Sequence, residues 1–517
     1  MKKKALSFLL SAAMTASMLT GCGIPGMTNE PAGGTEVTAD EPADTQAEVS
    51  EETADDKAED ADTSDDEAGT ETGEKEDNAG GSEDEDTDED GEKETVSKPP
   101  KDTGTVLNIY SWNDEFARRM RDHLPGYYVF DPEDAGKGGT YKGITVKFNL
   151  TPSLNDEYQN NLDALLPYNC EVADDERIDI FLVEADYALK YVDTGYVMPI
   201  SELGIDNSEL FDQYQYTKDI MTASDGTIRG LTWQGCPGVL IYNREIAKEV
   251  LGSDDPGEVQ EAVKNWDAWN DTARKVGEKG YKMTATVNDT YRVYSNNVRR
   301  RWVENDKIHI DDSIMDWLHS SKALVDNGLT TTAELWSEEW YEGFYPEGGV
   351  FCYFGPAWMI NLTMDADTEG SIANQGGWGA CEGPQSFYWG GSWIVAAAGT
   401  DNPSTVAKIM RAMTTDKEIM TDIVKKDSDF VNNKTVIEET SSGRDYAFDA
   451  LGGQNPVRMF ASGAEKLSLS NITEYDQGCN EEFQKAMKPY FDGEATKKEA
   501  LDEFYDVITR KYPELSY

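Results

Sequence analysis

The stretch Ile178-Asp-Ile-Phe-Leu-Val183 decides the fold class of this chain of 517 residues. It is apolar almost throughout, which is typical of a strand buried on both faces of a sheet. The pattern from Tyr187 to Thr194 predicts a helix, and Gly195 suits the left-handed cap that closes such a helix. A buried strand followed directly by a helix is the unit from which open α/β sheets are built.

The same alternation of strands and helices extends outward from this stretch. It implies parallel strand–helix–strand units in an α/β fold. Ligands of open parallel sheets bind beyond the carboxyl ends of the strands, so a site is expected in the loops that follow strands. The predicted strands are 106–110, 143–149, 238–242, 350–354 and 393–398. The predicted helices are 115–123, 156–165, 244–250, 266–276, 314–325 and most of 480–512, with a break at Gly493.

The N-terminus carries the pattern of an export signal. Lysines at 2–4 precede an apolar run over 5–19 that is too short to span a bilayer as a mature helix, so 1–21 is predicted to be a signal peptide. The run ends in Leu19-Thr20-Gly21-Cys22, which resembles the bacterial lipobox, where the signal is cut before the cysteine and its sulfur is diacylated. We therefore expect a lipid anchor on Cys22, on the extracytoplasmic face of the cell membrane. An ordinary signal peptide with a chance cysteine is the alternative.

Residues 22–103 have the composition of a disordered tether. From Gly23 to Thr103 there are 30 Asp and Glu against 5 Lys, and the stretch has no Trp, Tyr, Phe, Leu or Cys. Such a segment cannot bury enough apolar area to offset the entropy of ordering its backbone, and its like charges extend it. It is predicted to hold the folded part away from the bilayer. A calcium-binding role for this acidic segment is left open, although it lacks the spacing of an EF-hand loop.

Residues 104–517 are long enough for two lobes with sizeable cores, and they contain all twelve tryptophans. Their acidic balance argues against nucleic acid as a partner.

An odd, sparse set of cysteines is not a disulfide framework, although a Cys352–Cys381 pair is left open. No Cys/His spacing suits zinc, and neither a metal nor a cofactor is expected. The cysteines are Cys170, Cys236, Cys352, Cys381 and Cys479, and the histidines are His123, His309 and His319.

Five segments occur in an order that matches a known family. They are Leu107-Asn-Ile-Tyr-Ser-Trp-Asn-Asp114, Asp179-Ile-Phe-Leu-Val-Glu-Ala-Asp-Tyr187 with Gly195-Tyr-Val-Met-Pro-Ile200, Asp225-Gly-Thr-Ile-Arg-Gly230 through Tyr242-Asn243, Phe354-Gly-Pro-Ala-Trp358 and Tyr388-Trp-Gly-Gly-Ser-Trp393. In this order, spread over about four fifths of the chain, they resemble the extracellular solute-binding proteins of ATP-binding-cassette importers. The carbohydrate-binding, maltose-binding-like group is the most similar. The segment 124–141 and the acidic tether are inserts relative to that family.

The resemblance implies a two-lobed, periplasmic-binding-protein-like fold of type II, with discontinuous lobes joined by a hinge. The N-terminal lobe would comprise 104–235 plus 390–440, and the C-terminal lobe 236–389 plus 441–517. The ligand would lie in the cleft and stabilise the closed form, which the membrane permease and its ATPase would recognise. The resemblance thus implies a binding protein that acts as a monomer and hydrolyses nothing.

A sugar site needs flat aromatic surfaces for the C–H faces of the rings and polar groups for the hydroxyls. Both kinds of side chain occur together at the expected cleft loops. The candidates that follow strands are Trp112, Asn113, Asp114, Glu184, Asp186, Asp289, Tyr291 and Trp358, with Arg292 and Asn361 beside them. The candidates at the two crossovers between the lobes are Trp233, Gln234, Trp389, Gly390, Gly391 and Trp393, with Ser392 beside them.

Several candidates also have a purely structural interpretation. Asp114 and Asp186 precede helices and could serve as N-caps. A tryptophan in an α/β protein is often part of the core, and five of them lie in helical patterns and are predicted to pack: Trp266, Trp269, Trp317, Trp336 and Trp340. Three further candidates open the C-terminal helical region: Tyr475, Asp476 and Asn480.

The sequence argues against catalysis. It has no G-x-S-x-G elbow, no P-loop and no H-E-x-x-H, and the eight repeats of a β/α barrel are not visible. We therefore expect an extracytoplasmic lipoprotein that binds a sugar or oligosaccharide and delivers it to an ABC-type permease. The alternatives are a binding protein for an oligopeptide or an organic cation, a surface adhesin, and a surface glycoside hydrolase, because the count of carboxylates does not exclude the last.

Overall fold

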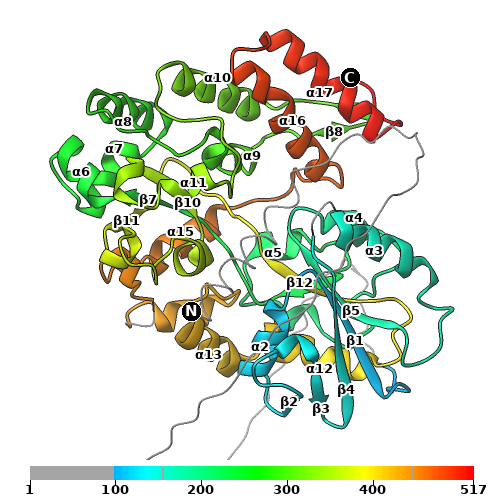
Figure 1. The fold of residues 1–517 in the computed structure, drawn as a ribbon. Helices are drawn as coiled ribbons and strands as arrows, with labels where there is room; N and C mark the ends of the chain where they lie inside the picture. Colours follow the sequence, from blue (N-terminus) through cyan, green and yellow to red (C-terminus); the bar gives the residue numbers. More distant parts are fainter. Residues whose placement is uncertain (1–97, 154–155, 444–445) are drawn as a thin grey trace, which may run out of the picture. The chain divides into compact units, whose positions relative to one another are not determined.

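The computed structural model describes residues 98–153, 156–443 and 446–517 (Figure 1). The predicted signal peptide, Cys22 and most of the predicted tether lie outside these residues, so their roles stay predictions. Within the described part, no helix is both long enough and apolar enough to cross a membrane.

A seven-stranded sheet contains the stretch that decided the fold class. Its strand order is β2-β3-β4-β1-β5-β12-β6, and β5 is buried at every position except its last, Glu184. Strands β4, β1 and β5 run parallel as predicted, whereas β12 is antiparallel to both β5 and β6. Figure 1 shows that β12, from late in the sequence, lies within the sheet of early strands. The strands are β1 (Val106–Ser111), β2 (Tyr127–Val129), β3 (Gly139–Tyr141), β4 (Ile144–Leu150), β5 (Ile178–Glu184), β6 (Gly230–Thr232) and β12 (Ser392–Ala396).

Helices from two distant parts of the sequence pack around this sheet. Helix α12 contacts β5, β6 and β12, and α13 contacts α2, although some 300 residues separate these last two. The helix predicted at Tyr187–Thr194 is a turn followed by the short α4. The helices are α2 (Glu115–His123), α3 (Glu157–Leu165), α4 (Leu189–Val192), α5 (Gln215–Asp219), α12 (Pro403–Thr414) and α13 (Lys417–Asp427).

A second sheet has three strands in the order β10-β7-β11. Both neighbours of β7 are antiparallel to it, so the prediction of parallel units is wrong for this sheet. The long connections after β7 bring the chain back to the sheet at the end where β7 finishes, so β10 and β11 run in the opposite direction to β7. Parallel strands would need a crossover, usually a single helix, back to the end where β7 begins. The strands are β7 (Val239–Asn243), β10 (Cys352–Gly355) and β11 (Trp378–Cys381), and the helices in this part are α6 (Arg244–Leu251), α7 (Pro256–Val263), α8 (Trp266–Glu278), α11 (Glu338–Glu342), α14 (Lys434–Thr440) and α15 (Val457–Lys466).

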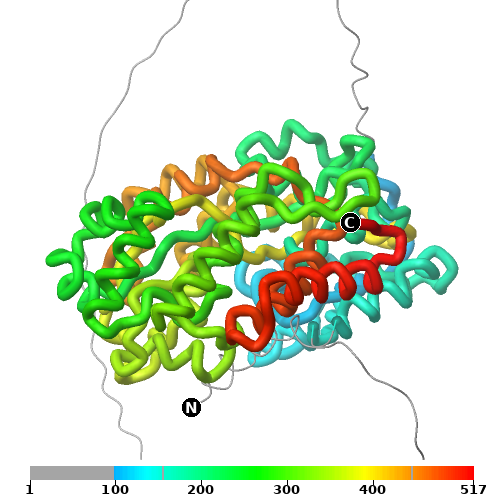
Figure 2. The backbone as a smooth tube through the Cα atoms, turned by 90° about the horizontal axis from the view of Figure 1, so that it is seen from above, coloured from blue at the N-terminus to red at the C-terminus, as the bar shows by residue number. Residues whose placement is uncertain are grey.

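The C-terminal helices build a separate hydrophobic cluster. Helix α16 packs against both α10 and α17, as Figures 1 and 2 show, and Trp302, Trp317, Phe483 and Phe504 are buried between them. Gly493 ends the first C-terminal helix in the left-handed region (φ 77°), which explains the predicted break. The elements are α9 (Tyr291–Ser295), β8 (Val303–Glu304), β9 (Lys307–Ile308), α10 (Asp312–Asp326), α16 (Asp476–Phe491) and α17 (Lys497–Lys511).

The folded part begins earlier than the predicted border between Thr103 and Gly104. The carboxylate of Asp102 accepts hydrogen bonds from the backbone N–H groups of Ser404 (2.7 Å) and Thr405 (3.1 Å), at the start of α12. The backbone N–H of Thr103 donates to the carbonyl of Asp401 (2.8 Å). The first N–H groups of a helix have no partner within the helix and favour a nearby carboxylate. Asp102 provides that carboxylate and therefore belongs to the folded part instead of the tether.

The five cysteines within the described residues are free thiols. Cys352 and Cys381 lie on β10 and β11, which flank β7 on opposite sides, opposite Tyr242 and Leu240 respectively. Two strand spacings across the sheet and two residues along β7 put their Cα atoms about 12 Å apart, beyond the reach of a disulfide. The pairing that the sequence left open is therefore not formed.

Candidate functional site

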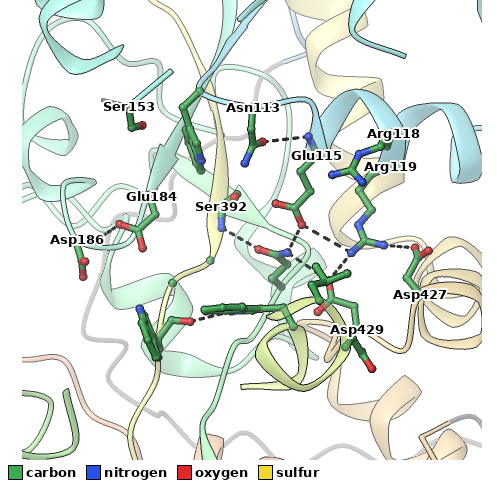
Figure 3. Close-up of a pocket in the computed structure, with 18 of the residues that line it drawn as sticks. Asn113, Glu115, Arg118, Arg119, Ser153, Glu184, Asp186, Ser392, Asp427 and Asp429 are labelled. Carbon is green, nitrogen blue, oxygen red and sulfur yellow. Dashed lines mark hydrogen bonds and ion pairs between the residues drawn. The ribbon is translucent and has the colours of Figure 1, made fainter. Parts of the chain in front are cut away.

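A cavity of about 510 Å³ lies where loops of the seven-stranded sheet face elements of the three-stranded sheet (Figure 3). The loops after β1 and β5 form one side. The segment after β10 and residues of α9 and α16 form the other, and the connection into β12 crosses between the two. Of the predicted residues, those that line this cavity are Trp112, Asn113, Glu184, Asp186, Gln234, Trp358, Trp389, Gly390 and Gly391, together with Arg292, Asn361 and Ser392.

Four tryptophans supply aromatic surface to the cavity. Trp112 makes edge contacts with Tyr158 and Tyr187, at 5.7 and 6.2 Å between ring centroids. Trp336, Trp358 and Trp389 form a second group, in which Trp336 stacks on Trp358 (6.2 Å, 25° between ring planes). The cavity therefore presents aromatic surface from both the β1 loop and the segments of the three-stranded sheet.

Trp336 is 8% exposed and packs in the hydrophobic core as predicted, but the prediction that it lies in a helix is wrong. Trp336 lies in a turn with φ at 69°, one residue before Ser337, whose hydroxyl caps the start of α11 (3.3 Å to the N–H of Trp340). Because it lies outside the helix, its side chain reaches the cavity. The serine N-cap is the sequence signal that could have placed Trp336 before the helix.

Two predicted tryptophans are core residues instead. Trp233 is 0% exposed and stacks on Phe116 (5.4 Å), and Trp393 is 1% exposed and donates its indole N–H to the carbonyl of Thr217 (3.0 Å). Their chain neighbours Gln234 and Ser392 line the cavity. Ser392 and Trp393 are successive residues of β12 and therefore point to opposite faces of the sheet, whereas Trp233 and Gln234 lie in the bend that follows β6.

Three other candidates also lie away from the main cavity. Asp114 precedes α2 but makes no cap hydrogen bond, and its carboxylate pairs with Arg118 (3.3 Å). Asp289 is buried, accepts the indole N–H of Trp340 (2.8 Å), and has its pKa raised to about 7 by burial. Tyr291 donates its hydroxyl to Asn480 (2.7 Å). Asp289 and Tyr291 line a smaller cavity next to the main one.

A polar network that the sequence did not indicate forms one wall of the cavity (Figure 3). Arg119 pairs with Asp427 and with Asp429 (3.1 Å) and lies 3.7 Å from Glu115. Gln234 joins it, donating to Glu115 (2.7 Å) and Asp429 (3.3 Å). Burial raises the pKa of Glu115 and of Asp429; burial alone would lower the pKa of Arg119, but Asp429, Glu115 and Asp427 raise it. The network holds Gln234 in place, with its amide oxygen accepting the backbone N–H of Ser392 (3.1 Å).

Glu184 and Asp186 lie on the opposite side of the cavity in Figure 3. Glu184 is partly accessible from the cavity, but the protein around it keeps most water away, and this desolvation, followed by the neighbouring Asp186, raises its pKa to about 8 against the lowering effect of Arg292. At neutral pH this carboxyl therefore carries a proton most of the time, so it can both donate and accept hydrogen bonds. Asp186 is not an N-cap: its two oxygens accept from the guanidinium of Arg292 at 2.8 and 2.5 Å.

The two glycines before β12 let the backbone itself form part of the wall. Gly390 and Gly391 have φ of 76° and 111°, a region that other residues adopt at a cost. A Cβ at Gly390 would project toward Trp358 and Glu184, both within 4 Å. The pair therefore serves both the turn and the close approach of the backbone to whatever fills the cavity.

The site is suited to holding a neutral, hydroxyl-rich molecule. Aromatic rings line it together with carboxyl, amide and guanidinium groups from several segments. Among the residues that the structure describes, no group of three or more His, Cys, Asp or Glu side chains could hold a metal ion.

Residues 138–448, more than half of the chain, match the sequence profile of the bacterial extracellular solute-binding proteins. The chain belongs to this family. The solute-binding proteins of this family act outside the cytoplasm. Comparison with curated protein sequences gives no match.

Solved structures of solute-binding proteins share the fold at low sequence identity. An extracellular solute-binding protein of family 1 is similar with a TM-score of 0.63 and 17% identity, over 78% of this chain and 99% of the other. The ABC transporter-associated binding protein from B. animalis subsp. lactis, in complex with beta-1,6-galactobiose, is similar with a TM-score of 0.57 and 15% identity, over 79% and 98%. The sugar-binding protein MalE from Xanthomonas citri is similar with a TM-score of 0.57 and 14% identity, over 79% and 98%. The predicted two-lobed α/β architecture is confirmed.

Proposed function

We propose that this solute-binding protein captures a sugar or oligosaccharide in the 510 Å³ cavity and delivers it to an ABC-type permease. The observation that carries the proposal is the meeting of four tryptophans with hydrogen-bonding side chains in one cavity. Similar proteins of known structure were solved with galactobiose or named as sugar-binding, which agrees with it.

The side chains of the cavity meet the demands of a pyranose. Trp112 and Trp358 offer apolar ring surface from opposite sides of the cavity. The apolar C–H faces of a sugar ring can pack against these surfaces. Glu184, largely protonated at neutral pH, can pair with a hydroxyl in either direction. Every hydroxyl that enters such a site must be paired, because a buried hydroxyl without a partner costs about 1–3 kcal/mol.

Closure of two lobes around the ligand would couple binding to delivery. We place the lobes at 104–235 plus 390–440 and at 236–389 plus 441–517; the position of β12 in the seven-stranded sheet supports this division. Two contacts join the sides of the cavity, Asp186 with Arg292 and the amide of Asn361 with the carbonyl of Ser428 (3.2 Å). A ligand that touches both sides adds to these contacts only in the closed form, so it shifts the population toward that form.

The proposal includes the cellular setting. The protein would be a monomer without catalytic activity, anchored through diacylated Cys22 to the outer face of the cell membrane. The acidic segment would act as the tether, with its folded end at Asp102.

Isothermal titration calorimetry of the full-length chain with a panel of neutral mono- and oligosaccharides tests the proposal. We expect at least one saccharide to bind saturably, and Trp112→Ala to weaken that binding by about 1–3 kcal/mol, because it removes apolar burial against a sugar ring. Tyr128→Ala is the matched control, since this aromatic residue is 72% exposed and does not line the cavity. Failure of every saccharide to bind would refute the proposal, and binding of quaternary ammonium compounds instead would favour the organic-cation alternative.

A further inference from the structure

A second, smaller cavity of about 90 Å³ adjoins the main one. Five residues line both cavities and therefore form the partition between them: Asp186, Arg292, Trp389, Gln477 and Glu481. The partition consists of side chains that come from four distant segments, namely the loop after β5, helix α9, helix α16 and the connection before β12. Such a wall can open by changes of rotamer, without movement of a strand or helix.

The centre of this partition is the ion pair between Asp186 and Arg292. The guanidinium donates to both carboxylate oxygens, at 2.8 and 2.5 Å, and lies over the ring of Trp389 at 5.4 Å from its centroid. The planar, doubly bonded geometry holds the arginine across the passage. The side chains of the pair are 22% and 33% exposed, so both are mostly buried, and a ligand that passes between the cavities must break both hydrogen bonds.

The smaller cavity has the chemistry of a place for one more sugar unit. By volume it has room for about six water molecules. The amide side chains of Asn288, Gln477, Asn480 and Gln484 line it, together with Tyr291 and Tyr388. An amide carries both donors and acceptors, and several of these groups already bond to neighbouring protein atoms and retain further hydrogen-bonding capacity. A hexose unit that displaced this water would find partners for its hydroxyls and a flat surface for its ring.

Resting on the proposed sugar-binding function, we propose that the Asp186–Arg292 pair is the residue pair that limits the length of the bound oligosaccharide. With the pair closed, the ligand ends at the guanidinium in the main cavity. When the pair is removed, the two cavities join and the oligosaccharide extends by a unit into the chamber lined by Asn288 and Gln484.

Calorimetric titration of the full-length chain with two length series tests this role, using maltooligosaccharides and β-1,6-linked galacto-oligosaccharides from the disaccharide upward. For wild type we expect the affinity to stop rising at a definite length. In Arg292→Met it should continue to rise for at least one further unit, with the longer oligosaccharides bound about tenfold more tightly than by wild type. The double variant Asp186→Asn/Arg292→Met should behave in the same way, and it leaves no unpaired carboxylate should the single variant fail to fold.

Arg118→Met is the matched control. Arg118 also pairs with an aspartate (Asp114, 3.3 Å) and lines the main cavity, but it does not line the smaller one. Its loss should change the affinity for all lengths by the same factor. The same cut-off length in wild type and in both Arg292 variants would overturn the inference while leaving the proposed function intact. If wild type binds neither series, the proposed function in these sugar classes and the inference fall together.

Discussion

At the scale of single residues, neighbours in the sequence have opposite roles. Gln234 and Ser392 face the cavity, whereas Trp233 and Trp393 beside them are buried in the core. The protonation of Glu184 also depends on its surroundings, because desolvation and the nearby Asp186 raise its pKa so that the carboxyl is mostly protonated at a pH where it would be ionised in water. Residue identity alone therefore does not separate binding groups from packing groups; the direction in which the side chain points does.

The raised pKa of Glu184 predicts a pH-dependent change in stability. Its folded-state pKa of about 8 lies above the ordinary value of 4.5, so the folded state binds this proton more tightly than the unfolded chain does. The stability associated with this group is fully present below the ordinary pKa and is lost as the pH rises through the folded-state value. Glu184→Gln removes that loss, so we expect it to raise the free energy of unfolding by on the order of 2–5 kcal/mol above about pH 8, because each pKa unit between 4.5 and 8 corresponds to about 1.4 kcal/mol. Urea unfolding at about pH 5 and above about pH 8 measures this, and an equal effect at both pH values would contradict it.

The contrast between Trp233 and Trp358 separates packing from binding. Trp233→Ala removes a fully buried ring that stacks on Phe116 and should cost about 3–5 kcal/mol of stability. Trp358 is only partly buried and lines the cavity. Trp358→Ala should therefore cost less stability but weaken saccharide binding by about 1–3 kcal/mol. Thermal melting measures the stability of both variants, and calorimetry measures their saccharide binding. A larger loss of stability in Trp358→Ala than in Trp233→Ala would contradict the assignment of Trp233 to packing and Trp358 to binding.

At the scale of elements, a helix end marks the border of the folded part. Helix α12 begins after Asn402, which makes no side-chain cap, and Asp102 supplies the acceptor from just over 300 residues earlier in the sequence. Helix α12 contacts three strands of the seven-stranded sheet, so this cap secures both the helix and the first residues of the fold.

Asp102→Ala should lower the free energy of unfolding by about 1 kcal/mol, the usual contribution of a helix cap. Lys101→Ala is the control, because its side chain is exposed and precedes the capping residue. A chain that begins at Lys98 should melt like the longer chain, whereas one that begins at Gly104 should melt several degrees lower. Identical melting of these two truncated chains would show that the cap contributes nothing.

At the scale of the whole molecule, the cavity exists only because distant segments meet. The loops after β1 and β5 come from the first part of the chain, Trp358 and Asn361 follow β10, and Asp427 and Asp429 lie at the end of α13 and just after it. The position of this cavity at the ends of β1 and β5 agrees with the expectation that ligands bind where parallel strands end.

The predicted anchoring also belongs to this scale. Because Cys22 follows Leu19-Thr20-Gly21, we expect Cys22→Ala to abolish labelling of the protein by a fatty-acid probe and to release it from membranes. Partition between detergent and aqueous phases measures this release, with Cys170→Ala, which alters an exposed thiol, as the control. Unchanged retention of the Cys22 variant in the detergent phase would exclude lipidation at this site.

The sequence by itself determined what depends on local pattern. The buried run 178–183, the helix 115–123 and the break at Gly493 follow from apolar spacing and backbone preference, and the structure has each of them. Asn113, two residues after β1, and Glu184, the last residue of β5, both line the cavity, because the position of a strand end follows from the strand itself. The family resemblance, which rested on the order of such segments, is confirmed.

Only the tertiary structure decided which side chains meet. The antiparallel direction of β12, the orientation of Trp233 and Trp393 toward the core, and the reach of Trp336 into the cavity depend on how distant segments pair. Arg119 and Asp429 form one network although 310 residues separate them in the sequence. Local preference cannot encode such contacts, because their energy arises only when the chain has brought both partners out of water into the same place.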